Sequence, residues 1–136
     1  EKIRATVAEF NPFVLELQHL NYGPELKRPR FLWAECGMSE EITALRGALL
    51  HLLDQSDDRP FRPHVTLARL RGNGAAIARR HPIDRVLSFS QQVKSVDFFR
   101  SPPPGATGYQ ILASAPLAER VAPAFGGWSG LNGSDF

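Results

Sequence analysis

The 136 residues suit a single domain with a real core, and a composition of 43% hydrophobic and 22% charged residues excludes a disordered chain. A single cysteine, Cys36, excludes an intrachain disulfide framework, and no apolar run is long enough to span a bilayer. The formal net charge is only +2, but it is uneven: residues 1–58 carry 6 basic and 10 acidic side chains, whereas residues 59–100 carry 9 basic and 2 acidic ones. With no signal-peptide character at the start, these features predict a cytoplasmic protein without a membrane partner.

The first part of the chain predicts a short helix followed by a strand. Apolar residues repeat at helical spacing over residues 2–10, and Asn11-Pro12 ends that helix. Residues 13–19 alternate, so Phe13, Leu15 and Leu17 share a face that we expect to pack on the core. His19 has the same core-facing parity, and because no hydroxyl lies two residues later we expect it to be structural. Residues 21–24 are typical of a turn.

A second strand and a helix follow. Residues 30–36 are almost continuously apolar, which indicates an interior strand. Cys36 at its end has no histidine partner nearby and is expected to be a core thiol. Ser39 is a good N-cap for a helix over residues 40–55, whose apolar stripe should pack on the sheet.

The basic block contains the strand on which the functional prediction depends. Over residues 59–71, two prolines fix an extended entry and the chain then alternates as a strand does. His64 and Thr66 are two residues apart, so both side chains leave the same face. An imidazole can move a proton near neutral pH, a hydroxyl can donate to a phosphate oxygen, and neighbouring guanidinium groups can balance the charge. The spacing suits a phosphoryl group, but it is also common in ordinary strands, so the pattern alone leaves both interpretations open.

The remaining pattern completes an α+β prediction. Residues 75–80 favour a helix that ends at His81, residues 89–101 favour strands, and residues 102–108 form a hairpin-type loop before a last strand over residues 109–115. We expect an antiparallel sheet with helices packed on one side, formed by residues 1–117, and an irregular tail over residues 118–136.

His64-Val65-Thr66-Leu67, followed by Arg69, resembles the second histidine motif of the two-histidine phosphoesterases. In particular, the sequence resembles the bacterial RNA 2′,3′-cyclic phosphodiesterases, historically called 2′-5′ RNA ligases. Residues 13–17, 28–34, 59–64 and 109–114 agree with that family in the expected order, so the resemblance covers roughly residues 1–117. It implies a bilobal, pseudo-symmetric fold in which two such motifs face each other across a cleft.

The sequence departs from the family in having one such motif, because His19, His51 and His81 all lack the hydroxyl at the required spacing. We expect the chain to lack the N-terminal portion that carries the first motif; a degenerate member or completion of the site by another chain would also account for it. Loss of a strand would expose a sheet edge, through which self-association is expected.

The resemblance implies an RNA-processing hydrolase that converts a 2′,3′-cyclic phosphate end to a 2′-phosphate without a metal or cofactor. One imidazole activates water and the other protonates the leaving ribose oxygen, and the same groups can form a 2′-5′ linkage in reverse. It assigns His64 as an acid/base group, with Thr66 and Arg69 as phosphate ligands. Regular alternation sends Arg69 to the opposite face, so it could reach the phosphate only through a bulge or from the end of the strand. Arg62 shares the parity of His64 and is a candidate for contacting the RNA backbone, although each arginine also fits a solvated surface charge.

Two other interpretations stay open. One is a non-catalytic RNA-binding domain that uses the basic block of residues 59–100, and the other is a purely structural fragment. The partners expected for the leading interpretation are RNA ends and nucleoside 2′,3′-cyclic phosphates. Because one positioned acid/base group contributes about 10²–10⁴ in rate, a chain with half of the pair should bind nucleotide ends weakly and turn over poorly.

Overall fold

The computed structural model describes residues 1–119, so most of the expected tail lies outside the described residues. The elements in chain order are α1 (Lys2–Val7), β1 (Phe13–Gly23), β2 (Phe31–Cys36), α2 (Glu40–Leu52), β3 (His64–Arg69), α3 (Gly74–Arg80), β4 (Asp84–Val93), β5 (Ser95–Arg100) and β6 (Gln110–Pro116). Across this part of the chain, no helix is long and apolar enough to cross a membrane.

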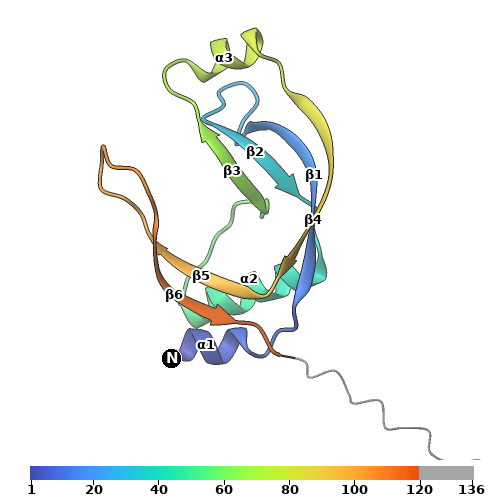
Figure 1. Ribbon diagram of the computed structural model, residues 1–136, viewed down its shortest axis with the longest axis vertical. Coiled ribbons are helices and arrows are strands. Elements are labelled where there is room, and N and C mark those ends of the chain that lie inside the picture. The colour runs from blue at the N-terminus through green and yellow to red at the C-terminus, as the bar shows by residue number, and fades with distance from the viewer. Residues whose placement is uncertain (120–136) are drawn as a thin grey trace, which may run out of the picture.

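Two antiparallel sheets organise residues 1–119, which confirms the predicted α+β class. The larger sheet has the strand order β3-β2-β1-β4, and β5 pairs with β6 in a second sheet. The long, curved strands β1 and β4 run from the end that carries α3 to the end that carries α1, α2 and the second sheet (Figure 1). β2 is interior, as predicted. β3 is an edge strand within the described residues. Self-association through this edge stays a prediction.

The core lies between the first two helices, the start of β1 and the end of β6. The buried cluster consists of Val7, Phe13, Leu45, Ala115 and Leu117. The predicted cap is confirmed, because the Ser39 hydroxyl accepts a hydrogen bond from the Ile42 amide at 3.3 Å. The helix ends at Leu52, short of the predicted residue 55.

A bulge in β1 overturns the predicted position of His19. Leu17 pairs with Cys36 and His19 pairs with Glu35, so Gln18 is an extra residue and the side chains on either side of it leave opposite faces. His19 therefore points away from the core-facing side, where its Nε2 contacts the carboxylate of Asp84.

The predicted turn over residues 21–24 was also wrong, because β1 continues in register to Gly23, opposite Phe31. A strand is favoured here because Trp33 lies directly over this glycine: an added Cβ at Gly23 would lie 2.4 Å from the Trp33 ring atom Cε3. Tyr22, on the other face, donates from its hydroxyl to the His81 carbonyl at 2.6 Å and so ties β1 to the end of α3.

Replacing Gly23 by alanine should destabilise the fold by about 1–3 kcal/mol, because the buried Trp33 ring must move to admit the methyl group. Chemical denaturation measures the change in the free energy of unfolding. Gly47→Ala is the matched control: nothing lies within 4 Å of its added Cβ, so in the interior of α2 it should stabilise by about 0.5–1 kcal/mol. A Gly23→Ala variant that is as stable as the original chain would contradict this packing.

Candidate active site on the β2–β3 face

The register between β2 and β3 determines which side chains share a face. Glu35 pairs with His64 and Trp33 pairs with Thr66. Residues directly opposite each other in an antiparallel pair project to the same side, and so do alternate residues of one strand. His64 and Thr66 therefore leave the same face of the sheet.

A bulge at Leu67 adds Arg69 to that face. Trp33 pairs with Thr66 and Leu32 pairs with Ala68, so Leu67 is an extra residue in β3. Beyond it, Arg69 pairs with Phe31, which has the same parity as Trp33 on β2. The Arg69 Cζ atom lies 5.5 Å from the centroid of the Phe31 ring. The predicted obstacle to a joint site, the wrong parity of Arg69, is removed by this one inserted residue.

The His64 ring is held in a defined tautomer. Its Nδ1 atom lies 2.7 Å from the carbonyl oxygen of Arg62. Because a carbonyl only accepts hydrogen bonds, Nδ1 must carry a proton and donate it, which leaves Nε2 as the atom that can accept or release a proton. The ring also stacks on Trp33, with centroids 3.8 Å apart and planes inclined by 21°. The residue is otherwise exposed.

Arg62 lies just before β3 and is engaged by the protein. Its Nη2 pairs with the carboxylate of Glu35, and its Nη1 donates to the Pro24 carbonyl at 2.7 Å. The guanidinium carbon lies 5.0 Å from the centroid of the Trp33 ring. Because the carbonyl of Arg62 orients His64, these contacts fix the backbone that holds the imidazole. Arg62 lies before β3, so the alternation of the strand does not determine the direction of its side chain.

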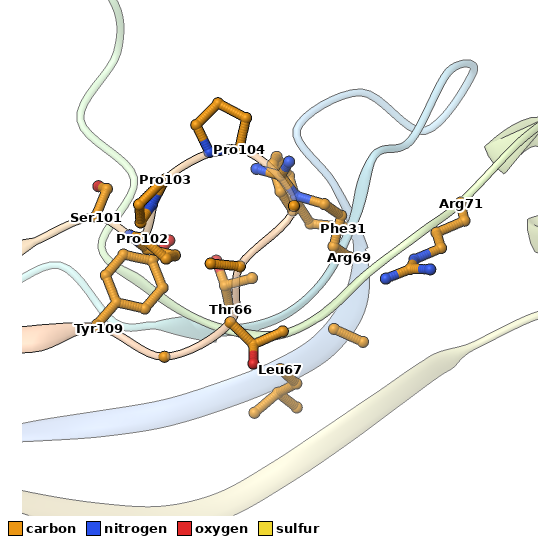
Figure 2. A pocket seen from close by; sticks show the side chains of 15 residues that line it. Phe31, Thr66, Leu67, Arg69, Arg71, Ser101, Pro102, Pro103, Pro104 and Tyr109 are labelled. Carbon is orange, nitrogen blue, oxygen red and sulfur yellow. The ribbon is translucent and has the colours of Figure 1, made fainter.

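His64 and Thr66 open onto two neighbouring cavities. The first, which we call the proline-loop cavity, has a volume of about 920 Å³. It is lined by Phe31, residues 66–69, Arg71 and residues 101–109. Figure 2 shows the proline-rich turn between β5 and β6 opposite Thr66 and Arg69. Its lining contains arginines and hydroxyl groups but no acidic residue.

The second, which we call the arginine cavity, has a volume of about 720 Å³. It is lined by Pro24, Glu25, Arg30, Phe31, Trp33, Arg46, Asp57, Arg59, Pro60, Phe61, Arg62 and His64. Phe31 belongs to both linings, so the two cavities lie side by side along the face that carries His64 and Thr66.

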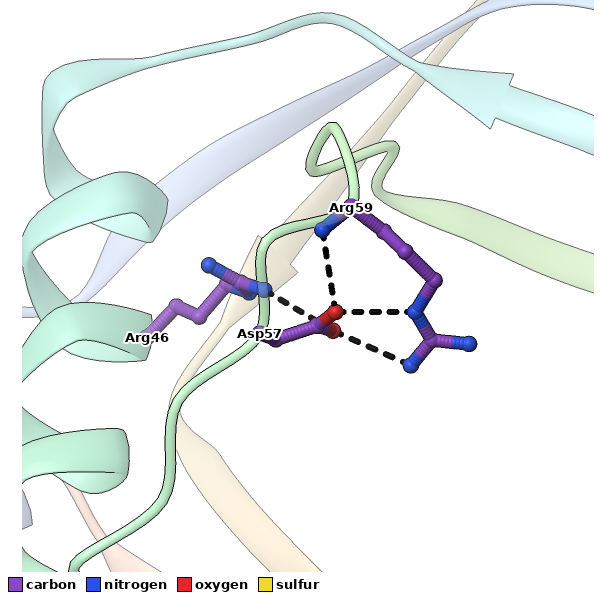
Figure 3. Close-up of polar contacts among 3 residues, drawn as sticks. All are labelled: Arg46, Asp57 and Arg59. Atoms are coloured by element: carbon purple, nitrogen blue, oxygen red, sulfur yellow. Dashed lines mark hydrogen bonds and ion pairs between the residues drawn. The ribbon is translucent and has the colours of Figure 1, made fainter.

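Asp57 organises two of the arginines in the second cavity (Figure 3). Its Oδ1 accepts hydrogen bonds from the Arg59 amide at 3.2 Å and from Arg59 Nε at 2.8 Å. Its Oδ2 accepts from Arg59 Nη2 at 3.1 Å and from Arg46 Nη2 at 3.2 Å. These hydrogen bonds, those from the Arg59 side chain above all, lower the pKa of Asp57 to about 2. The carboxylate is therefore fully ionised at neutral pH.

Other candidate groups lie apart from this face or lack the required chemistry. Burial raises the pKa of the Cys36 thiol, which disfavours the thiolate that a nucleophile needs. His51 lies on α2, and His81 caps α3. Within residues 1–119, no cluster of three or more His, Cys, Asp or Glu side chains could hold a metal ion.

The family model of the 2′-5′ RNA ligase superfamily matches residues 1–102, which is most of the chain. The chain belongs to the 2′-5′ RNA ligase superfamily. This confirms the resemblance found in the sequence, and it relates the chain to phosphoesterases and ligases. The comparison with curated proteins found no match.

A solved structure shares the fold. The protein TT0787 of Thermus thermophilus is 21% identical, with a TM-score of 0.65 over 88% of this chain and 68% of that one. At this identity the likeness concerns the fold alone.

The Asp57 network predicts a pH dependence. A 13C NMR titration should give a midpoint of about 2 for the Asp57 carboxyl group, and Arg59→Gln should raise it toward the ordinary value of 3.8. Because the pKa is lowered in the folded protein, the stabilisation is present above pH 3.8 and is lost as the pH falls toward 2. Arg85→Gln, on the opposite face of the sheet, should leave the midpoint unchanged. A midpoint that stays at about 2 in Arg59→Gln would contradict the assignment of the lowered pKa to the hydrogen bonds from Arg59.

Proposed function

We propose that this protein hydrolyses the 2′,3′-cyclic phosphate end of RNA to a 2′-phosphate, and that His64 is one of the acid/base groups. The observation that carries the proposal is the bulge at Leu67, which brings the cation of Arg69 to the face that carries the imidazole of His64 and the hydroxyl of Thr66. Membership of the superfamily supports RNA as the substrate class.

The groups on this face match the needs of the reaction. A water oxygen forms a new bond to phosphorus, and the bond from phosphorus to the 3′ oxygen breaks. The proton lost by water goes to a base, and the 3′ oxygen takes up a proton from an acid. Nε2 of His64 is free for either role, while Thr66 and Arg69 offer hydrogen-bond donors to the phosphate oxygens. With a 5′ hydroxyl in place of water, the same groups would form a 2′-5′ linkage: the 5′ oxygen bonds to phosphorus and gives its proton to the base, while the 3′ oxygen leaves and takes a proton from the acid.

Two-histidine chemistry needs a second acid/base group, and the 136-residue sequence holds one His-x-Thr motif. We therefore expect this chain to turn over slowly. Among the described residues, the other histidine on this face is His19. It lies two strands away, because His19 of β1 pairs with Glu35 of β2 and Glu35 pairs with His64 of β3. The Nε2 atom of His19 is already engaged by Asp84.

His64→Ala should lower the rate of 2′-phosphate formation from a nucleoside 2′,3′-cyclic phosphate by about 10²–10⁴, because a positioned proton-transfer group is lost. Chromatography of the nucleotide products measures the rate, with affinity measured separately by calorimetry and expected to change little. His51→Ala, on the exposed side of α2, is the matched control and should keep the original rate. Equal rates for both variants would refute the catalytic role of His64.

Arg69→Ala should weaken binding of the cyclic phosphate roughly tenfold or more, because a hydrogen-bonding cation is lost from the phosphate. Arg85→Ala removes an equal charge from the other face of the sheet and should have little effect on binding at moderate salt. Calorimetric titration with a nucleoside 2′,3′-cyclic phosphate measures the affinity of each variant. The same loss for both variants would show that only net charge matters.

The non-catalytic alternative has its own support in the basic block, where the guanidinium groups of Arg62 and Arg69 lie over the rings of Trp33 and Phe31. It predicts that the protein binds RNA in a salt-dependent way and forms no 2′-phosphate product, with or without His64→Ala.

A further inference from the structure

Two arginines beside Phe31 have no acidic partner in the described part of the chain. Within residues 1–119, carboxylates pair with three other arginines of the candidate site, namely Arg46, Arg59 and Arg62. No ion pair in this range includes Arg30, which lines the arginine cavity, or Arg69, which lines the proline-loop cavity. The protein therefore leaves the charges of these two guanidinium groups available to an anion.

Both guanidinium groups lie against the same aromatic ring. The Cζ atom of Arg30 lies 5.7 Å from the centroid of the Phe31 ring, and that of Arg69 lies 5.5 Å from it. Figure 2 shows Arg69 beside Phe31, with Arg71 directed away from both. Guanidinium groups are attracted to aromatic faces, so the Phe31 ring keeps two like charges close together before any ligand binds.

A row of stacked rings links Phe31 to His64. The centroids of Phe31 and Trp33 lie 6.2 Å apart with planes inclined by 11°, and those of Trp33 and His64 lie 3.8 Å apart. The proposed function places Arg69 on the phosphate. Because the two Cζ atoms lie at 5.5 and 5.7 Å from one ring centroid, a phosphate on Arg69 is also close enough to Arg30 for a Coulomb interaction.

The proposed reaction changes the charge of the phosphate. A 2′,3′-cyclic phosphate is a diester with a single negative charge at neutral pH. The 2′-phosphate is a monoester whose second proton dissociates with a pKa of about 6, so above neutral pH it is mostly a dianion. Coulomb energy is proportional to the product of the charges, so each guanidinium group stabilises the dianion about twice as strongly as the monoanion.

We propose that Arg30 and Arg69 together form a binding site for a phosphate monoester dianion, so that the protein binds a 2′-phosphate more tightly than the cyclic phosphate. The identity of this dianion as the reaction product rests on the proposed function, but the preference for a dianion over a monoanion does not. The product then inhibits the protein. Arg30, which takes no part in the proton transfers, determines how strongly it does so.

The test compares two nucleotides of similar size and different charge, a nucleoside 2′-monophosphate and the corresponding 2′,3′-cyclic phosphate. Calorimetric titrations are made in the His64→Ala background, so that the cyclic ligand is not consumed. At about pH 7.5 and an ionic strength of about 0.15 M, the monophosphate should bind roughly tenfold more tightly. At about pH 5 both ligands carry one charge, and the difference in affinity should disappear.

Arg30→Gln tests the assignment to Arg30. At about pH 7.5 it should weaken the monophosphate about tenfold and the cyclic phosphate about threefold, because the Coulomb energy lost is half as large for a single charge. At about pH 5 both losses should be about threefold. Arg30→Lys keeps the positive charge and should keep the preference for the dianion.

Arg28→Gln is the matched control. Arg28 precedes the same strand, is exposed and lies outside the linings of both cavities, so its replacement should change either affinity by less than about twofold. Thermal unfolding checks that each variant folds. Because Arg30 is exposed, Arg30→Gln should keep the Tm of the parent chain.

The outcomes separate this inference from the proposed function. Equal affinities for the two ligands at about pH 7.5, or equal losses for both in Arg30→Gln, overturn the dianion site even if the chain hydrolyses cyclic phosphates. A larger loss for the monophosphate in Arg30→Gln supports the site even if no 2′-phosphate is ever formed. That result would refute the proposed function only.

Discussion

The candidate site depends on one constraint, the register in which β3 pairs with β2. A regular strand would send every second residue after His64 to the same face, and Arg69 would lie on the other side with Val65. The additional residue at Leu67 changes the parity of everything that follows it, so the histidine, the threonine and the arginine face one side. An edge strand tolerates such a bulge because only one neighbour has to adjust to it.

A second constraint is the stacking of the His64 imidazole on the Trp33 ring. Trp33 is buried between Gly23 of β1 and the ring of His64, and the guanidinium of Arg62 lies over it. The absence of a side chain at position 23 is what allows the indole to lie flat against the sheet. The stacked ring and the Arg62 carbonyl together restrict both the orientation and the tautomer of His64. The proposed chemistry therefore depends on packing in three neighbouring strands.

Much of this arrangement could be predicted from the sequence. A continuous apolar run located β2, an apolar stripe located α2, and helix-compatible residues before His81 located α3. The Ser39 cap was recognisable from its residue type, and the ordered motifs identified the superfamily. The bulges at Gln18 and Leu67 could not be predicted, because a bulge is defined by the partner strand and neither position carries a glycine or proline. The Asp57 network was missed for a related reason: Asp57 and Arg59 are close in sequence, but Arg46 reaches them only through the fold.

The stacking of Trp33 on His64 has a spectroscopic consequence. A protonated imidazole in contact with an indole quenches its emission more strongly than a neutral imidazole does. At 3.8 Å between ring centroids, the intrinsic fluorescence of Trp33 should therefore respond to the charge on His64. The chain carries an optical indicator beside the proposed acid/base group, with no dye to attach. Trp128, the other tryptophan in the sequence, has to be replaced before the signal can be attributed to Trp33 alone.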